Sequence, residues 1–283
     1  MQTAVERVIT NMWDRYDEPL SLEEMADMAV FSRFYFSRVF RSITGTSPGR
    51  FLTAIRLYKA KSLLLETTTS VTDISYQVGY NSPGTFSSRF TRSVGISPAR
   101  YRYLSETGIP APEYPLVTGQ HLGGLRGSVT APQTDVPTRV YVSLFDSTIP
   151  QGTPIACAVL DGESSFELLG VPEGQWFIHA TAVAVRNLDP RPWMRKPVYV
   201  AASRPVKVVA GRTVTANVEL RPPRLTDLPI LLALPELDSR TPVVPSALAA
   251  PDAEPDTGWQ RPRPLDTTSS GKALAGTSRL AAT

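Results

Sequence analysis

Hydrophobic residues in the first hundred positions recur every three to four residues, which is the spacing of amphipathic helices. Two stripes show this spacing: Phe36, Val39, Phe40 and Ile43, and then Phe86, Phe90 and Val94. Between them, residues 51–66 contain neither Pro nor Gly and predict one helix with an apolar stripe of Leu57, Ala60 and Leu64. After residue 119 the period changes to two, which is typical of β-strands. The pattern therefore predicts a multidomain protein in which an all-α part is followed by an all-β part.

The two helical stripes belong to an internal repeat. Residues 32–50 align with residues 82–100, and eight positions are identical. The identical pairs are Ser32/Ser82, Phe36/Phe86, Ser37/Ser87, Phe40/Phe90, Gly45/Gly95, Ser47/Ser97, Pro48/Pro98 and Arg50/Arg100. Upstream the similarity continues with an offset of 49, so the second copy has one extra residue near 79–81. Each copy predicts a helix, a tight turn and a second helix.

Residues that begin and end helices occur at the expected places in both copies. Ser21 and Glu24 have the spacing of a capping box, and Ser70 with Asp73 is a weaker version. The other expected boundaries are the N-cap serines Ser32 and Ser82, Pro83 in a first helical position, and the terminal glycines Gly45 and Gly95.

The face opposite each apolar stripe is polar and basic. It presents Arg33, Phe34, Ser37, Arg38 and Arg41 in the first copy, and Thr85, Ser87, Ser88, Arg89 and Arg92 in the second. Residues 32–61 contain seven Lys or Arg and no acid, and residues 82–102 contain four Arg and no acid. A solvated helix face explains any one arginine, but two acid-free copies favour a polyanionic partner. Because a helix fits the major groove of DNA, these ten residues are candidate DNA contacts.

Charge and proline divide the chain near residue 107. Residues 1–106 hold 13 basic and 10 acidic side chains, whereas residues 107–283 hold 16 of each, and only four of the 26 prolines precede residue 107. The single cysteine, the absence of a basic-then-apolar leader and the absence of a long apolar run predict a cytoplasmic protein without a membrane partner.

The second half predicts an antiparallel β-sandwich over residues 119–222, preceded by a Pro-rich linker, 107–118. Its expected strands are 125–131, 139–145, 155–160, 165–169, 175–185, 197–201, 206–209 and 213–220. Residues 223–283 are predicted to be a Pro-rich tail. A segment near 228–234 could dock as a further strand, and disorder is expected beyond about Ser239.

Residues 1–104 resemble the DNA-binding domain of the AraC family of bacterial transcription regulators, which has two helix-turn-helix units joined by a long helix. The matching segments are Val71-Thr-Asp-Ile-Ser-Tyr-Gln-Val-Gly-Tyr80, Phe86-Ser-Ser-Arg-Phe90, Gly95-Ile-Ser-Pro-Ala-Arg-Tyr-Arg102, and Arg56-Leu57, Ala60 and Leu63-Leu64 in the linker. The resemblance implies sequence-specific binding to double-stranded DNA, with two recognition helices in adjacent major grooves. Many members carry this domain after a cupin-like effector domain, so that effector pocket cannot be transferred to this chain.

In the first unit, the resemblance implies that Phe34, Ser37 and Arg38 face bases and that Arg33 and Arg41 lie nearer phosphates. In the second unit it implies that Pro83, Gly84, Thr85, Ser87 and Ser88 face bases. Pro83 and Gly84 depart from the family pattern because they offer a base edge almost nothing. We therefore expect the first unit to supply most base readout, and the second to contact phosphates through Arg89, Arg92 and backbone amides.

The second half resembles the carboxypeptidase-regulatory or transthyretin-like group of β-sandwiches, whose members are packing or binding modules. The similar segments are Gly124-Leu-Arg-Gly-Ser-Val129, Asp161-Gly162, Ser165-Phe166 and Val171-Pro-Glu-Gly-Gln-Trp-Phe177.

Enzyme chemistry has no support in the sequence. His121 and His179 are the only histidines, and Cys157 lies in an apolar strand. Trp176 and Trp193 could line a ligand surface, but we expect core packing for at least one of them. We therefore expect no enzyme activity, no cofactor and no metal site. Two other functions stay open: a protein-interaction adaptor, and a small-molecule sensor whose DNA contact is subordinate. RNA polymerase is a further candidate partner, and the effector and the oligomeric state are left open.

Overall fold

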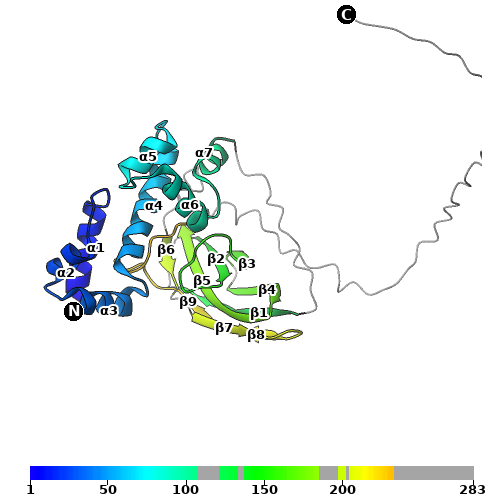
Figure 1. The fold of residues 1–283 in the computed structure, drawn as a ribbon. Coiled ribbons are helices and arrows are strands. Elements are labelled where there is room, and N and C mark those ends of the chain that lie inside the picture. The colour runs from blue at the N-terminus through cyan, green and yellow to red at the C-terminus, as the bar shows by residue number, and fades with distance from the viewer. Residues whose placement is uncertain (108–120, 133–136, 163, 185–196, 202–203, 233–283) are drawn as a thin grey trace, which may run out of the picture. The chain divides into compact units, whose positions relative to one another are not determined.

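A computed structural model of the chain describes residues 1–107, 121–132, 137–162, 164–184, 197–201 and 204–232 (Figure 1). The chain divides into two compact units, Met1–Pro245 and Ser246–Thr283, and every described residue belongs to the first. Most of the predicted linker, Trp193 and the tail beyond residue 232 lie outside the described residues. In the part of the chain described, no helix is long and apolar enough to cross a membrane.

Helices occupy the first 107 residues, as predicted. They are α1 (Gln2–Asp14), α2 (Leu22–Ala29), α3 (Arg33–Thr44), α4 (Pro48–Glu66), α5 (Val71–Gln77), α6 (Pro83–Val94) and α7 (Pro98–Thr107). The expected repeat is present, because α2 with α3 and α5 with α6 are the two helix pairs. The predicted central helix, α4, begins three residues earlier than expected, with Pro48 in its first turn.

The long helix α4 buries its predicted stripe and also a second set of side chains, in two separate hydrophobic cores. Phe51, Leu52 and Ile55 join the core that α1, α2 and α3 form. Leu57 and Leu64 join the core of α5, α6 and α7 instead. Each core contains edge-on aromatic pairs, a geometry that rings prefer in packed interiors. The centroids of Phe40 and Phe51, for example, lie 5.5 Å apart. Both helix pairs are therefore packed on one rigid element.

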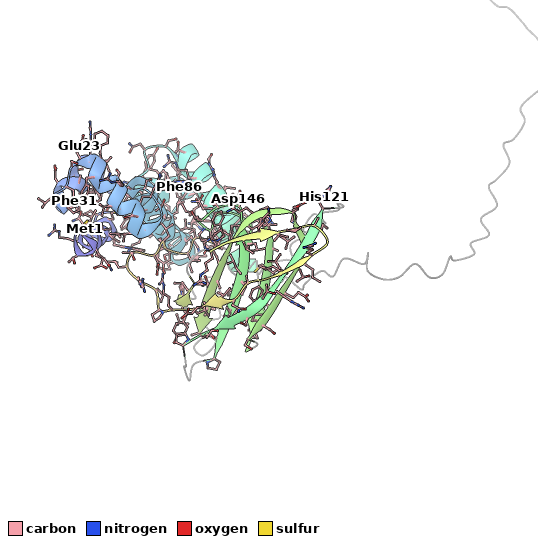
Figure 2. The ribbon with its side chains drawn as sticks, turned by 90° about the horizontal axis from the view of Figure 1, so that it is seen from below. Met1, Glu23, Phe31, Phe86, His121 and Asp146 are labelled. Atoms are coloured by element: carbon pink, nitrogen blue, oxygen red, sulfur yellow. The ribbon has the colours of Figure 1, made fainter. Side chains whose placement is uncertain are left out.

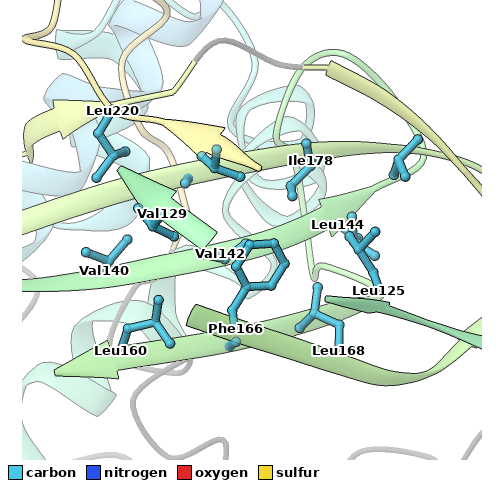
Figure 3. Packing of buried hydrophobic residues seen from close by; sticks show 14 of the residues in the cluster. Leu125, Val129, Val140, Val142, Leu144, Leu160, Phe166, Leu168, Ile178 and Leu220 are labelled. Atoms are coloured by element: carbon cyan, nitrogen blue, oxygen red, sulfur yellow. The ribbon is translucent and has the colours of Figure 1, made fainter. Parts of the chain in front are cut away.

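Strands form the second part of the described chain. They are β1 (Leu122–Thr130), β2 (Thr138–Phe145), β3 (Ala156–Asp161), β4 (Ser165–Pro172), β5 (Gly174–Ala184), β6 (Pro197–Val200), β7 (Arg204–Val208), β8 (Thr213–Thr215) and β9 (Val218–Glu219). One sheet has the order β4-β1-β8, with β9 also pairing with β1, and the other has the order β3-β2-β5-β6, with β7 also pairing with β5. Side chains from both sheets, including Leu125, Phe166, Val142 and Ile178, pack into one core (Figure 3).

The prediction of a purely antiparallel arrangement is wrong. Strands β8 and β9 run parallel to β1, and the predicted strand 213–220 is divided between them. The returning backbone lies so close to β1 that only glycine fits there. A Cβ atom on Gly127 would lie 1.7 Å from the carbonyl oxygen of Ala216, and one on Gly123 would lie 2.4 Å from that of Val209. The glycines in this strand therefore allow the parallel return of the chain.

The prediction of a docked strand near 228–234 is also wrong. Residues 228–232 are described and contain no strand. Two of their carbonyl groups, those of Ile230 and Leu232, accept hydrogen bonds from Nζ of Lys61 on α4, at 3.4 and 3.0 Å. The side chain of Leu231 is buried in the core of α5, α6 and α7. The segment is held by a side chain and by apolar packing instead of by strand pairing.

Candidate DNA interface

The first helix pair is positioned by a complete capping box. The side chain of Ser21 accepts from the amide of Glu24 at 3.2 Å, and the carboxylate of Glu24 accepts from the amide of Ser21 at 2.7 Å. The hydrogen bond from the amide of Ser21 holds the pKa of the Glu24 carboxyl below its ordinary value. The turn to α3 passes through Val30, which adopts the left-handed conformation at φ 59°. Ser32 is the N-cap of α3 as predicted, but its side chain makes no capping bond.

Helix α3 turns its predicted apolar stripe inward and its basic face outward. Phe36, Val39 and Phe40 are buried. The candidates Arg33, Phe34, Arg38 and Arg41 are exposed, and Ser37 is half-buried. Phe34 is 77% exposed, which is unusual for a phenylalanine and leaves its ring free to contact a partner. The sequence-based candidates of the first unit therefore share one accessible helix face.

Two of the arginines on α3 are oriented by neighbouring side chains. Arg33 donates to the carboxylate of Glu23 on α2 at 2.8 Å, and its guanidinium lies 5.0 Å from the ring centroid of Phe34. The guanidinium of Arg38 lies 5.4 Å from the ring centroid of Tyr35. Residues 32–61 contain no acid, but Glu23 lies ten positions before Arg33 and so falls outside that range. Since both partners of this ion pair are largely exposed, it contributes little to stability and can open.

The second helix pair has the same construction with different capping. The side chains of Ser70 and Ser82 accept from the amides of Asp73 and Thr85, at 3.0 and 3.4 Å. Helix α6 begins at Pro83, as predicted. Both recognition helices end at the predicted glycines, Gly45 at φ 77° and Gly95 at φ 101°.

The outward face of α6 carries shorter side chains than that of α3. Thr85, Ser88, Arg89 and Arg92 are exposed, and Ser87 is half-buried. Gly84, also exposed, adds no side chain at the start of the helix. Guanidinium groups can bond guanine edges or phosphates, whereas the hydroxyl groups reach only a short distance. Apart from its two arginines, α6 therefore exposes shorter side chains than α3 does.

Two further arginines of the matching segments brace the scaffold. Nε of Arg56 donates to the carbonyl oxygen of Tyr16 at 2.6 Å, and one of its terminal nitrogens donates to that of Glu18 at 2.7 Å. Arg102 donates in the same way to the carbonyl oxygens of Leu64 and Thr69, at 3.0 and 2.6 Å. These arginines tie α4 to the α1–α2 loop and α7 to the end of α4.

The residues considered for other chemistry do not converge on a site. Figure 2 marks His121, which is exposed at the start of β1, with Nδ1 3.9 Å from the carboxylate of Glu173. Burial lowers the pKa of His179 to about 4, so this imidazole is neutral at physiological pH. Cys157 accepts from the hydroxyl of Ser143 at 3.2 Å, and Trp176 donates to the carbonyl of Pro172 at 2.8 Å while packing on the core. Among the described residues, no three potential ligands are grouped to hold a metal ion.

Comparison with known proteins identifies the helical part. Residues 25–103 match the model of a helix-turn-helix domain family. Over 103 residues the chain is 38% identical to the lactose operon transcription activator of Staphylococcus xylosus, covering 36% of each chain. It is 34% identical over 131 residues to the transcriptional regulator Rob of Salmonella typhimurium, covering 46% of this chain and 41% of that protein. The chain thus spans little more than a third of the length of these relatives.

Solved structures are similar to a part of the chain of comparable length. The DNA-binding domain of AdpA, solved in complex with a target DNA, is 32% identical and covers 37% of this chain and 94% of that one, with a TM-score of 0.36. An AraC-type regulator from Chromobacterium violaceum is 29% identical and covers 36% and 92%, with a TM-score of 0.34. With the repeat, the caps and the family match at hand, residues 25–103 of this chain form a helix-turn-helix domain similar to those of bacterial transcription regulators.

Proposed function

We propose that the protein is a sequence-specific transcription regulator in which α3 and α6 enter adjacent major grooves of one DNA duplex. The observation that carries this proposal is the pair of matched helix-turn-helix units, each presenting an exposed helix face without acidic residues. Helix α4 has 19 residues and so spans about 28 Å, close to the distance of about 34 Å that separates successive major grooves. One subunit could therefore read both grooves.

Within this proposal, the ten candidate residues divide into two roles. Phe34, Ser37 and Arg38 on α3 supply most of the base readout, and Arg33 and Arg41 contact phosphates. On α6, Thr85, Ser87 and Ser88 contribute less to base readout, while Arg89 and Arg92 bind phosphates. The exposure of these side chains and the short reach of those on α6 support this division.

The strand-rich part is the regulatory or partner-binding half in this proposal. We assign the boundaries 1–106 to the DNA-binding domain and 119–222 to a β-sandwich of the carboxypeptidase-regulatory or transthyretin-like type. The core shared by two sheets supports the sandwich assignment. The proposed role places the protein in the bacterial cytoplasm with the chromosome. Contact with RNA polymerase is part of the proposal, and enzyme activity is not.

Selection of binding sites from random duplexes by the full chain, at two salt concentrations, tests the DNA-binding role. We expect an enriched sequence that extends over two adjacent major grooves, with binding that weakens as salt rises. Arg38→Ala should weaken the enrichment, whereas Arg126→Ala, at an exposed position on β1, should not. Salt-sensitive binding without enrichment would reduce the domain to a general DNA clamp, and the absence of binding would favour the adaptor hypothesis.

A further inference from the structure

A cavity of about 510 Å³ lies beside the first half of α4 and the second half of α6. Its lining includes Arg50 from α4 and Arg89 and Arg92 from α6. Pockets for small molecules typically enclose about 300–1,000 Å³, so this volume is sufficient for a metabolite. Arg50 pairs with Arg100 in the internal repeat but is not among the ten candidate DNA contacts.

The polar part of this cavity is strongly cationic. Among the lining residues that the structure describes, three carry a guanidinium group and none carries a carboxylate. Arg50, Arg89 and Arg92 form no ion pair with any other residue that the structure describes. Guanidinium groups pair with phosphate in a two-bond geometry that matches their planar fork. The three arginines are therefore available to an anion.

The cavity also has an apolar lining, which a bare inorganic ion would not use. Ala54 on α4 and Leu231 from the 228–232 segment form part of the wall with their small exposed surfaces, 6% and 3%, while Leu57, also at the cavity, is fully buried. A duplex backbone passes over a protein surface and leaves such a recess unfilled. An anion with a carbon skeleton satisfies both parts of the lining.

We propose that this cavity is a binding site for a small organic phosphate. The phosphate group pairs with Arg50, Arg89 and Arg92, and the organic part lies against Ala54 and Leu231. A phosphate monoester fits better than a monocarboxylate, because its two negative charges match the threefold positive lining. The start of α4 adds a favourable dipole, since Ser47 and Gly49 line the same cavity and the side chain of Ser47 makes no capping bond.

The site has a regulatory consequence, which rests on the proposed DNA-binding function. Arg89 and Arg92 belong both to the cavity and to the proposed phosphate contacts of the second recognition helix. A ligand that occupies these guanidinium groups competes with DNA for them. We therefore expect an organic phosphate to weaken DNA binding by the intact protein.

Calorimetric titration of the full chain with phenyl phosphate, in the absence of DNA, tests the site. Phenol and inorganic phosphate serve as ligands that lack one half of the probe. We expect saturable binding of phenyl phosphate, weaker binding of inorganic phosphate and no binding of phenol. Arg50→Gln should weaken phenyl phosphate binding roughly tenfold by removing a charge-assisted contact. Arg126→Gln makes the same change in charge at an exposed position on β1 and should have no effect.

A second pair of variants tests the site without removing a native side chain. A Cβ atom on Gly49 would meet no atom within 4 Å, so a longer side chain can be accommodated there. Gly49→Glu adds a carboxylate to the lining and should abolish phenyl phosphate binding, whereas the neutral Gly49→Gln should retain most of it. Equal binding by the two Gly49 variants, an equal effect of Arg50→Gln and Arg126→Gln, or no saturable binding by the native chain would overturn the proposal.

The link to DNA is measured separately, by titrating the selected duplex with and without saturating phenyl phosphate. Competition predicts weaker DNA binding with phenyl phosphate, and no such change in Gly49→Glu. If the chain binds no DNA, the proposed function fails while the calorimetric result stands. If DNA affinity is unchanged by bound phenyl phosphate, the competitive role is overturned.

Discussion

Arg38 is the residue whose side chain has the best means of reading a base in the proposed complex. It is exposed on α3, and the ring of Tyr35 holds its guanidinium at 5.4 Å from the centroid. An ordered guanidinium loses less freedom when it bonds a guanine edge. Thr85, a candidate base contact on α6, has a hydroxyl of short reach. The two side chains should therefore differ in their contribution to specificity.

We expect Arg38→Ala to lose about 1–3 kcal/mol of discrimination at the base pair it contacts, and Thr85→Ala to lose less than half of that amount. The measurement is the affinity of each variant for the selected duplex and for single base-pair changes within it. Arg126→Ala controls for the loss of one positive charge. An equal loss of specificity in Arg38→Ala and Thr85→Ala would contradict the proposed asymmetry.

Val30 stores strain in the turn of the first helix pair. It is the one non-glycine residue with positive φ in the described part of the chain, and its branched side chain is 82% exposed. The left-handed conformation costs an L-residue about 1–2 kcal/mol. Because the side chain packs against little, Val30→Gly should relieve this strain and raise the free energy of unfolding by about 1 kcal/mol. Urea denaturation at neutral pH measures the change.

Gly45→Val makes the opposite change to Val30→Gly, because it places a branched side chain on a left-handed residue. The φ of Gly45 is 77°, and a Cβ atom there would meet no atom within 4 Å, so the cost of Gly45→Val is conformational. We expect a loss of about 1–2 kcal/mol. Unchanged stability in both variants would show that neither turn constrains the backbone as the structure indicates.

Helix α4 buries a charged residue, Lys61, against the 228–232 segment. Its Nζ bonds the carbonyl oxygens of Ile230 and Leu232 and lies 5.7 Å from the ring centroid of Tyr101. Among the described residues no carboxylate pairs with it, and burial lowers its pKa from 10.5 to about 7. The folded chain therefore releases a proton that the unfolded chain retains between about pH 7 and 10.5.

This difference predicts that stability rises as the pH increases from 7 towards 10.5, and that the cost of burying Lys61 is fully present below pH 7. Lys61→Met keeps the apolar stem and removes the charge. We expect it to raise the free energy of unfolding by about 1–3 kcal/mol at pH 6, with a smaller gain at pH 9. Denaturation at several pH values tests this. Lys59→Met is the control on the same helix, since that ammonium lies over the rings of Trp13 and Tyr16.

The elements that depend on local chemistry could be predicted from the sequence. The capping box of Ser21 and Glu24 and the terminal glycines Gly45 and Gly95 act within one helix turn, so the residues themselves indicate the structure. The repeat also identified both helix pairs and the outward faces of α3 and α6. The left-handed turn at Val30 gave no such signal, because it lacks the glycine that usually marks this conformation.

Elements that depend on distant contacts could not be predicted in the same way. A period of two indicates a strand but not its direction, so the parallel pairing of β8 and β9 with β1 was missed. Lysine in a helix ordinarily indicates a solvated face, and only the segment 169 to 171 positions later makes Lys61 buried. The cavity likewise joins Arg50 to Arg89 and Arg92, which lie on two helices and share no sequence pattern.

Residues 228–232 contact both the helical part and the strand-rich part of the described chain. Leu231 is buried with Leu57 and Tyr101 in the helical core of α5, α6 and α7. Its neighbours Ile230 and Leu232 pack instead with Tyr141 and Phe145 of β2. Successive side chains thus enter different clusters, and the segment links a helical core to the strand-rich part. The segment is therefore one physical connection between the two parts, in addition to the hydrogen bond that the amide of Gly152 donates to the carbonyl oxygen of Ser93 at 3.0 Å.

Leu231→Asp tests this link by placing a carboxylate in an apolar core, where an unpaired charge is strongly unfavourable. We expect faster amide hydrogen exchange in α4 and α7, and also in β2, because the displaced segment uncovers Tyr141 and Phe145. Leu225→Asp is the matched control, since Leu225 precedes the same segment but is 44% exposed; exchange should be unchanged there. Faster exchange in the helices alone would show that the segment stabilises the helical core without linking it to the strands.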